Sequence, residues 1–197
     1  MAFMLCGTLI PACVIAYYGM TDRSGAFTLA NLVAIASGEH AKALGLSLLL
    51  AFASTVICLL LAFPLGLALK DSRLGKKGFM VFVFILPMWM NFLLRTMAWQ
   101  VLLEKNGIIN GMLAGIGLPA LNIINTPAAV ILGMVYDYLP FMILPIYNAL
   151  IKIDNNLIEA AYDLGASKSL VFRKVIVPLS VPGIVSGVTM VFVPSLT

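Results

Sequence analysis

Two ionisable residues of opposite charge, Arg95 and Asp137, lie inside long apolar stretches of the sequence. A charge at the centre of an apolar span costs about 2.5–3.5 kcal/mol on insertion scales, so such residues usually face a partner or an aqueous pathway. Asp137 is flanked by Tyr136 and Tyr138. A carboxylate between aromatic rings suits an organic ammonium group through charge and cation–π contacts. Pairing of Asp137 with Arg95 is an equally good interpretation.

Arg95 has two ordinary interpretations. It lies eight residues before Leu103, near the end of its apolar stretch. A long side chain in that position can extend to a polar interface while its methylene groups stay in apolar surroundings. The other interpretation is a structural ion pair.

The remaining residues that carry chemistry form no recognisable site. Cys6, Cys13 and Cys58 sit in apolar stretches, with no C-x-x-C partner and no histidine at ligand spacing. The single histidine, His40, falls in a short polar segment. Residues 75–77 (Gly-Lys-Lys) lack the upstream glycine and the following Ser or Thr of a phosphate-binding loop. We therefore expect no catalytic residue, no metal site and no cofactor bound by this chain.

The composition indicates that these residues are positioned by elements that fold in a membrane. Hydrophobic residues make up 62% of the chain and charged residues 10%, against about 25% charged residues in a typical soluble domain. The mean hydropathy is +1.07. Eight of the twelve Lys and Arg lie in segments 70–77 and 152–174, between apolar stretches. This distribution is typical of membrane proteins and does not form a basic face for nucleic acid.

Five apolar stretches predict an all-α integral membrane fold with five transmembrane helices. A spanning helix needs about 20 residues, so the second to fourth stretches are long enough and the first is marginal. The first stretch lacks the basic residues that begin a signal peptide. The fifth stretch is still apolar at Thr197, which predicts an incomplete fifth span in a C-terminally truncated chain. The stretches cover about 2–18, 43–69, 79–103, 128–151 and 179–197.

The basic clusters predict the orientation of the chain. Segments 70–77 and 152–178 carry eight Lys and Arg between them, whereas segments 19–42 and 104–127 carry three. Cytoplasmic loops carry the excess of Lys and Arg. We therefore expect the first two segments to be cytoplasmic, the other two external, and the N-terminus cytoplasmic.

The cytoplasmic segment 154–178 predicts two short helices joined by a tight turn. Asp154 or Asn155 can cap the start of the first, and Gly165 can end it. Ser167 can cap the second. The first helix has an apolar stripe of Leu157, Ala161 and Leu164, with Glu159 and Asp163 off that stripe; the second has a broad apolar face of Val171, Phe172, Val175 and Ile176.

Two short helices with a turn of small residues form a compact cytoplasmic knob. Alanines allow close approach to another surface, so the knob suits insertion into a groove of a partner protein. An interfacial hairpin that rests on lipid headgroups is an equally good interpretation of the same periodicity.

The knob carries a more specific pattern than its periodicity. It resembles the loop of binding-protein-dependent ABC importer permeases that docks on the ATPase subunit. The resemblance implies an ATPase contact by Glu159, Ala160, Ala161, Asp163, Gly165 and Ala166. The matching residues are Glu159-Ala160-Ala161-x-x-Leu164-Gly165-Ala166-Ser167, followed by Phe172, Val175, Pro178, Pro182-Gly183-Ile184 and Gly187.

Further stretches are similar to the permeases of spermidine/putrescine importers within this family. The resemblance implies a polyamine pathway with the candidates Asp137, Tyr136, Tyr138, Arg95 and Trp99. Another solute, such as ferric ion, sulfate or an amino acid, is the alternative, as is a membrane scaffold fragment that does not transport. The matching stretches are Phe27–Leu32, Arg95-Thr96-x-Ala98-Trp99-x-x-Leu102-Leu103, Gly107-x-x-Asn110 and Val135-Tyr136-x-x-Leu139-Pro140-Phe141-Met142.

The resemblance implies a multi-subunit machine in the bacterial cytoplasmic membrane. The chain would be one type I permease domain over residues 1–197, surrounded by lipid and paired with a second permease. ATPase subunits would bind the ATP, and an external binding protein would deliver the substrate. Members of the family have six spans and an N-terminal extension, from which this sequence departs.

Overall fold

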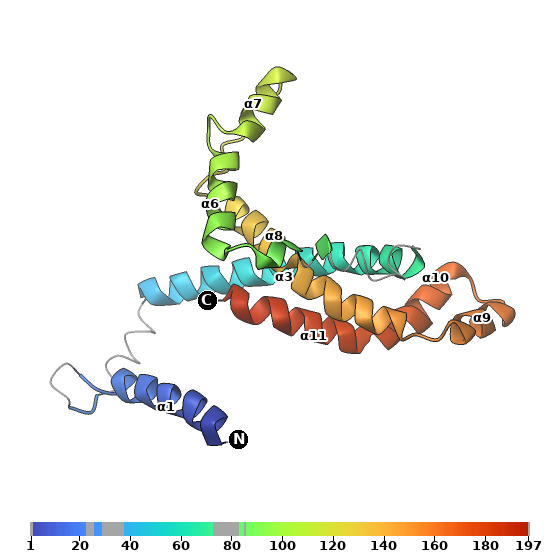
Figure 1. Cartoon of the computed structure of the whole chain (residues 1–197), viewed down its shortest axis with the longest axis horizontal. Coiled ribbons are helices and arrows are strands. Elements are labelled where there is room, and N and C mark those ends of the chain that lie inside the picture. Colours follow the sequence, from blue (N-terminus) through green and yellow to red (C-terminus); the bar gives the residue numbers. More distant parts are fainter. Residues whose placement is uncertain (1, 23–25, 29–37, 73–82, 85, 197) are drawn as a thin grey trace. The chain divides into compact units, whose positions relative to one another are not determined.

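The computed structural model describes residues 2–22, 26–28, 38–72, 83–84 and 86–196 (Figure 1). Apart from one isolated bridge between Thr21 and Phe27, these residues form helices and connecting turns. The all-α prediction is confirmed. The elements are α1 (Ala2–Gly19), α3 (Gly38–Asp71), the 3₁₀ turn η1 (Leu86–Trp89), α6 (Phe92–Leu103), α7 (Ile108–Gly115), α8 (Pro127–Ile151), α9 (Asn155–Asp163), α10 (Lys168–Val171), the π-helical segment η2 (Phe172–Ile176) and α11 (Val177–Ser195).

The described residues contain three helices that are long and apolar enough to cross a membrane. They are α3, α8 and the continuous helical stretch Lys168–Ser195. Only 22–28% of the most apolar part of each is buried within the chain. Most of their apolar surface must therefore face lipid or other subunits. The predicted number of five spans is not confirmed.

The third predicted span, 79–103, is not one continuous helix over its described residues. Residues 79–82 and 85 lie outside the described part of the chain. The 3₁₀ turn η1 ends at Trp89, and Asn91 then caps a new helix by accepting a hydrogen bond from the Leu93 amide at 2.9 Å. The new helix, α6, has 12 residues, a rise of about 18 Å, which is well short of the apolar thickness of a bilayer.

The chain divides into two compact units, residues 1–48 and 49–197. In the first unit, α1 covers the first predicted apolar stretch and continues through Pro11. Its Tyr17 and Tyr18 rings meet edge to face with centroids 5.8 Å apart. Helix α3 begins in the first unit and continues into the second. The second unit contains all the residues that the sequence analysis assigns to a site.

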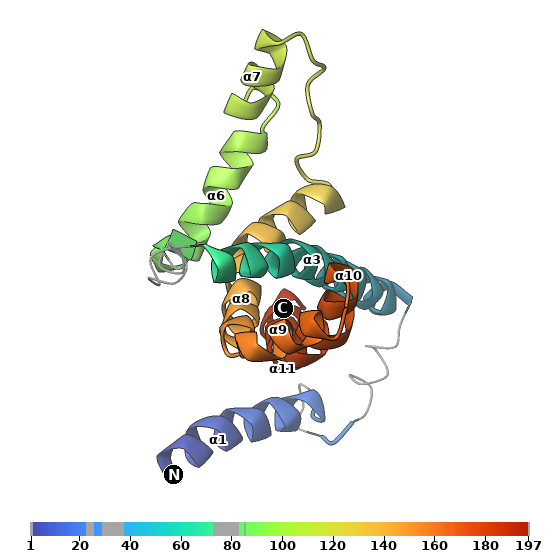
Figure 2. The ribbon, with the colours of Figure 1, turned by 90° about the vertical axis from the view of Figure 1, so that its right-hand side faces the viewer.

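The second unit is built on the close packing of α8 and α11, which run side by side (Figures 1 and 2). Gly183 and Gly187 of α11 lie against the backbone of α8. A Cβ atom added at Gly183 would come within 2.7 Å of the Pro145 carbonyl oxygen, and one added at Gly187 within 2.7 Å of the Met142 sulfur. Small residues four apart allow such an approach, which provides the packing contact that holds helices together in lipid.

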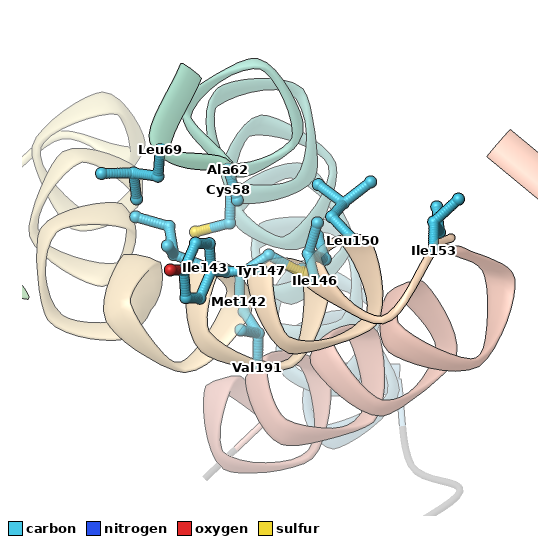
Figure 3. Packing of buried hydrophobic residues seen from close by; sticks show 10 residues of the cluster. All are labelled: Cys58, Ala62, Leu69, Met142, Ile143, Ile146, Tyr147, Leu150, Ile153 and Val191. Carbon is cyan, nitrogen blue, oxygen red and sulfur yellow. The ribbon is translucent and has the colours of Figure 1, made fainter. Parts of the chain in front are cut away.

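Helix α3 completes the core of the second unit. Its buried residues recur at spacings of three and four and are mostly small. Gly66 lets α3 approach the side chains of Ile146 and Leu150 on α8. Figure 3 shows Cys58 and Ala62 of α3 facing this side of α8. The core cluster consists of Cys58, Ala62, Leu69, Met142, Ile143, Ile146, Tyr147, Leu150, Ile153 and Val191.

The segment between α6 and α8 is folded around one polar side chain, Asn110 of α7. Its Nδ2 donates to the Glu104 carbonyl oxygen at 3.0 Å and to the Leu121 carbonyl oxygen at 3.1 Å, and its Oδ1 accepts from the Leu121 amide at 2.7 Å. The close turn before α7 requires glycine at position 107, because a Cβ atom there would lie 2.5 Å from the Val101 carbonyl oxygen. The short helix of this segment is α7.

The α8–α11 contact gives a first prediction. Gly183→Ala should lower the free energy of unfolding by about 1–3 kcal/mol, because the added methyl group meets backbone atoms that cannot move aside. Gly45→Ala is the matched control, since it lies on α3 with nothing within 4 Å of an added Cβ. Thermal unfolding of the purified subunit in detergent measures both. Equal midpoints for the two variants would contradict the packing described.

Candidate functional site

An ion pair joins α6 to α8 within the second unit. Arg95 Nε lies 2.7 Å from Asp137 Oδ1, and the two side chains are only 10% and 9% exposed. The contact is close but not aligned as a hydrogen bond. Asp137 is the eleventh residue of the 25-residue α8, so its carboxylate lies near the middle of that helix. The pairing that the sequence left open is therefore present.

Arg95 has contacts besides the carboxylate. Its Nη1 donates to the Pro87 carbonyl oxygen of η1 at 3.0 Å. Its guanidinium carbon lies 6.0 Å from the centroid of the Tyr136 ring, at the outer limit of a cation–π contact. One turn along α6, the Trp99 ring meets the same Tyr136 ring edge to face at 5.3 Å. Arg95 is thus anchored by three groups.

A cavity of about 340 Å³ lies beside the ion pair. Three predicted pathway residues, Trp99, Asp137 and Tyr138, line it, whereas Arg95 and Tyr136 do not. Its walls come from α6, the residues just before α8, the first half of α8 and the end of α11. The lining is Phe92, Thr96, Trp99, Gln100, Leu103, Ile124, Asn125, Ala129, Val130, Gly133, Met134, Asp137, Tyr138, Pro194 and Ser195.

The three hydroxyl groups that line the cavity each donate a hydrogen bond to a backbone carbonyl oxygen. Thr96 donates to Phe92 at 3.0 Å, Ser195 to Val191 at 2.6 Å, and Tyr138 to Pro194 at 3.2 Å. Each oxygen is left with lone pairs for a ligand. Together with the Asp137 carboxylate, the lining offers acceptors and negative charge. An ammonium group, which carries only donors, is the complementary chemistry.

Sequence reasoning missed several cavity residues, including Thr96, Gln100 and Ser195. A signal for two of them was present, because Thr96, Trp99, Gln100 and Leu103 recur at i, i+3, i+4 and i+7 on one face of α6. Ser195 offered no such signal. It reaches the cavity only because the α8–α11 contact brings the end of α11 beside Tyr138.

The predicted knob at 154–178 has the expected ends of its first helix. Asp154 Oδ1 accepts from the Asn156 amide at 2.9 Å and caps α9. Gly165 ends the helix with φ +80°. The Gly165 amide donates to the Tyr162 carbonyl at 2.8 Å and the Ala166 amide to the Ala161 carbonyl at 3.1 Å, the paired bonds of a Schellman motif. The Ser167 cap of α10 is also present.

The predicted stripe of α9 faces away from the core of the chain. Leu157 is 52% exposed and Leu164 is 89% exposed, while Ile158 packs against the core cluster instead. Glu159, Ala160, Asp163 and Gly165 are exposed, and Ala161 and Ala166 are partly buried. The knob therefore presents Leu157, Leu164, Ala160 and Gly165 outward, away from the rest of the described chain.

The second predicted helix of the knob is only partly α-helical. α10 ends at Val171, and Phe172–Ile176 form a π-helical segment in which the Val177 amide donates to the Phe172 carbonyl. Pro178 follows and has no amide hydrogen to continue the α-helical pattern. The Phe172 ring packs edge to face on Phe63 of α3 at 5.7 Å. This segment carries the knob directly into α11.

Comparison with known proteins places both regions in one family. The family described as "Binding-protein-dependent transport system inner membrane component" matches residues 60–197, which include the cavity and the knob. The chain belongs to this family. Membership confirms the resemblance stated from the knob motif and places the chain among transporter permeases of the inner membrane.

Several relatives carry a more specific name. The chain is 36% identical over 196 residues to the "Spermidine/putrescine transport system permease protein PotB" of Haemophilus influenzae, covering 95% of this chain and 68% of the relative. It is 37% identical to the protein of that name from Escherichia coli, covering 86% and 62%. It is 35% identical to the E. coli "Inner membrane ABC transporter permease protein YdcU", covering 84% and 57%. The chain thus spans 57–68% of the length of these relatives.

Proposed function

We propose that this chain is a permease subunit of an ATP-driven importer that carries polyamines across the bacterial cytoplasmic membrane. The cavity supports a cationic solute, because its buried carboxylate and its three hydroxyl oxygens can accept from groups that only donate. The Asp137 carboxylate in its wall would repel an anion such as sulfate. The relatives that are named for spermidine and putrescine support the same substrate class.

Family membership and the exposed surfaces support the proposed assembly. A second permease forms the other half of the pathway, and an external binding protein delivers the substrate. The knob at 154–178 docks on an ATPase subunit, where Leu157, Leu164 and the small residues around Gly165 enter a groove. ATP is bound and hydrolysed in that partner, which supplies the catalytic residues.

The substrate class is tested by uptake of labelled spermidine in bacteria that lack their own polyamine importers and express the assembled transporter. Thr96→Val combined with Ser195→Ala should raise KM at least about 100-fold, because two hydrogen bonds to a charged group are lost at about 1.5–3 kcal/mol each. Thr189→Val with Ser186→Ala is the matched control, since both hydroxyls lie on the exposed side of α11 and bond to their own helix. N-acetylated spermidine should compete poorly. Uptake that both double variants leave unchanged would contradict the cavity as the substrate site.

Docking of the knob is tested at Gly165. Gly165→Asp should abolish spermidine uptake and substrate-stimulated ATPase activity, because a side chain there projects into open space where the partner would lie. Gly117→Asp is a matched control for backbone strain, about 1–2 kcal/mol in each case, since Gly117 also has positive φ (+74°) and nothing within 4 Å. Equal loss or equal retention of uptake in the two variants would count against docking through the knob.

The proposed orientation places the knob inside and the α6–α8 connection outside. In a variant without its natural cysteines, Ala114→Cys should react with an impermeant maleimide added to whole cells, and Ser169→Cys should react only after lysis. Both positions are exposed in the chain, so accessibility depends on the side of the membrane. The reverse pattern would invert the topology and place the N-terminus outside.

A further inference from the structure

Two side chains of α6 that are one turn apart attach it to α8. Arg95 pairs with Asp137, and Trp99 packs on Tyr136. The two partners on α8 are adjacent in sequence, so the attachment is concentrated at one place. The ion pair is the more costly of the two contacts to break, because both members are buried and removing one strands the other.

Asp137 both pairs with Arg95 and lines the cavity. Its carboxylate contacts Arg95, and the same residue lines the cavity, whereas Arg95 does not. A cation that enters the cavity therefore meets the carboxylate without first meeting the guanidinium. The two positive groups then compete for one negative charge in a region that excludes much of the water, where such interactions are strong.

Arg95 can lose its carboxylate partner without becoming isolated. Its Nη1 remains bonded to the Pro87 carbonyl oxygen, and its guanidinium remains near the Tyr136 ring. Arg95 retains a hydrogen-bonded place when Asp137 is engaged elsewhere. An arginine that served the ion pair alone would be left as a buried unpaired charge.

We infer that Arg95 is a resident cation that holds Asp137 while the cavity is empty, and that an ammonium group of the substrate displaces it. The ion pair is then a latch between α6 and α8 that substrate binding releases. This inference rests on the proposed polyamine transport. It assigns Arg95 a positioning role, acting through Asp137, and it links occupancy of the cavity to movement of α6.

Kinetics of the assembled transporter test the competition. Arg95→Gln removes the competing charge, so KM for spermidine should fall about fivefold, as expected when a competing closed state is removed. Asp137→Asn should instead raise KM or abolish uptake, when uptake is normalised to the amount of subunit in the membrane. Lys105→Gln is the control for loss of one positive charge, because Lys105 lies just beyond α6, exposed and outside the cavity. The KM of the Lys105→Gln transporter for spermidine should equal that of the wild type.

Hydrogen exchange on the wild-type transporter tests the latch without a substitution. Release of α6 predicts that the amides of residues 92–103 exchange faster when spermidine is added in the absence of nucleotide, since local opening controls their protection. A binding site that only closes around its ligand predicts slower exchange of the same amides. Faster exchange supports the latch, and slower or unchanged exchange overturns it. This measurement decides the question even if Arg95→Gln lowers the amount of subunit in the membrane.

The two proposals fail in different ways. If the wild type imports spermidine and Asp137→Asn does not, while Arg95→Gln has the wild-type KM, the latch is wrong and the proposed function stands. If Arg95→Gln has the wild-type KM and Asp137→Asn retains uptake, Asp137 is not the cation site. If the wild type imports no polyamine, both proposals are wrong.

Discussion

The close approach of α8 and α11 determines where both candidate sites lie. In lipid, two apolar helices gain little from hiding apolar surface, so they associate where small residues let their backbones meet. Gly183 and Gly187 provide that contact against Pro145, Ala149 and Met142. At one end of the pair, the last turn of α11 brings Ser195 and Pro194 into the cavity. At the other, the same helix continues into the knob (Figure 1).

Local sequence signals predicted the elements that depend on local chemistry. The caps at Asp154 and Ser167 and the glycine stop at Gly165 were predicted because they rest on hydrogen bonds between near neighbours. The fourth apolar stretch matches α8 within one residue. The third apolar stretch does not match a single helix, because average hydropathy is insensitive to a break such as the one that Pro87 and Asn91 introduce.

The candidate site was only half predictable, because its residues meet through tertiary packing. Charge within apolar stretches identified Arg95 and Asp137, since an uncompensated charge there is costly. It left open whether they meet, which depends on the angle between α6 and α8. Ser195 lay beyond prediction for the same reason. Its sequence neighbourhood is that of any apolar helix, and only the position of α11 makes it a wall of the cavity.

The π-helical segment η2 sets the rotational phase between the knob and the membrane helix. Val171 and Ser180 are both buried, nine residues apart, and at about 100° per residue an uninterrupted α-helix would place them half a turn apart. A π turn accommodates one residue more than an α turn, so it removes about 100° from that angle. Val171 can thus be buried while Gly183, three residues after Ser180, still lies against α8. The knob and the α8–α11 contact therefore have separate orientations on one continuous helix. A torque on the knob reaches α11 through η2, which is the least regular turn of that helix.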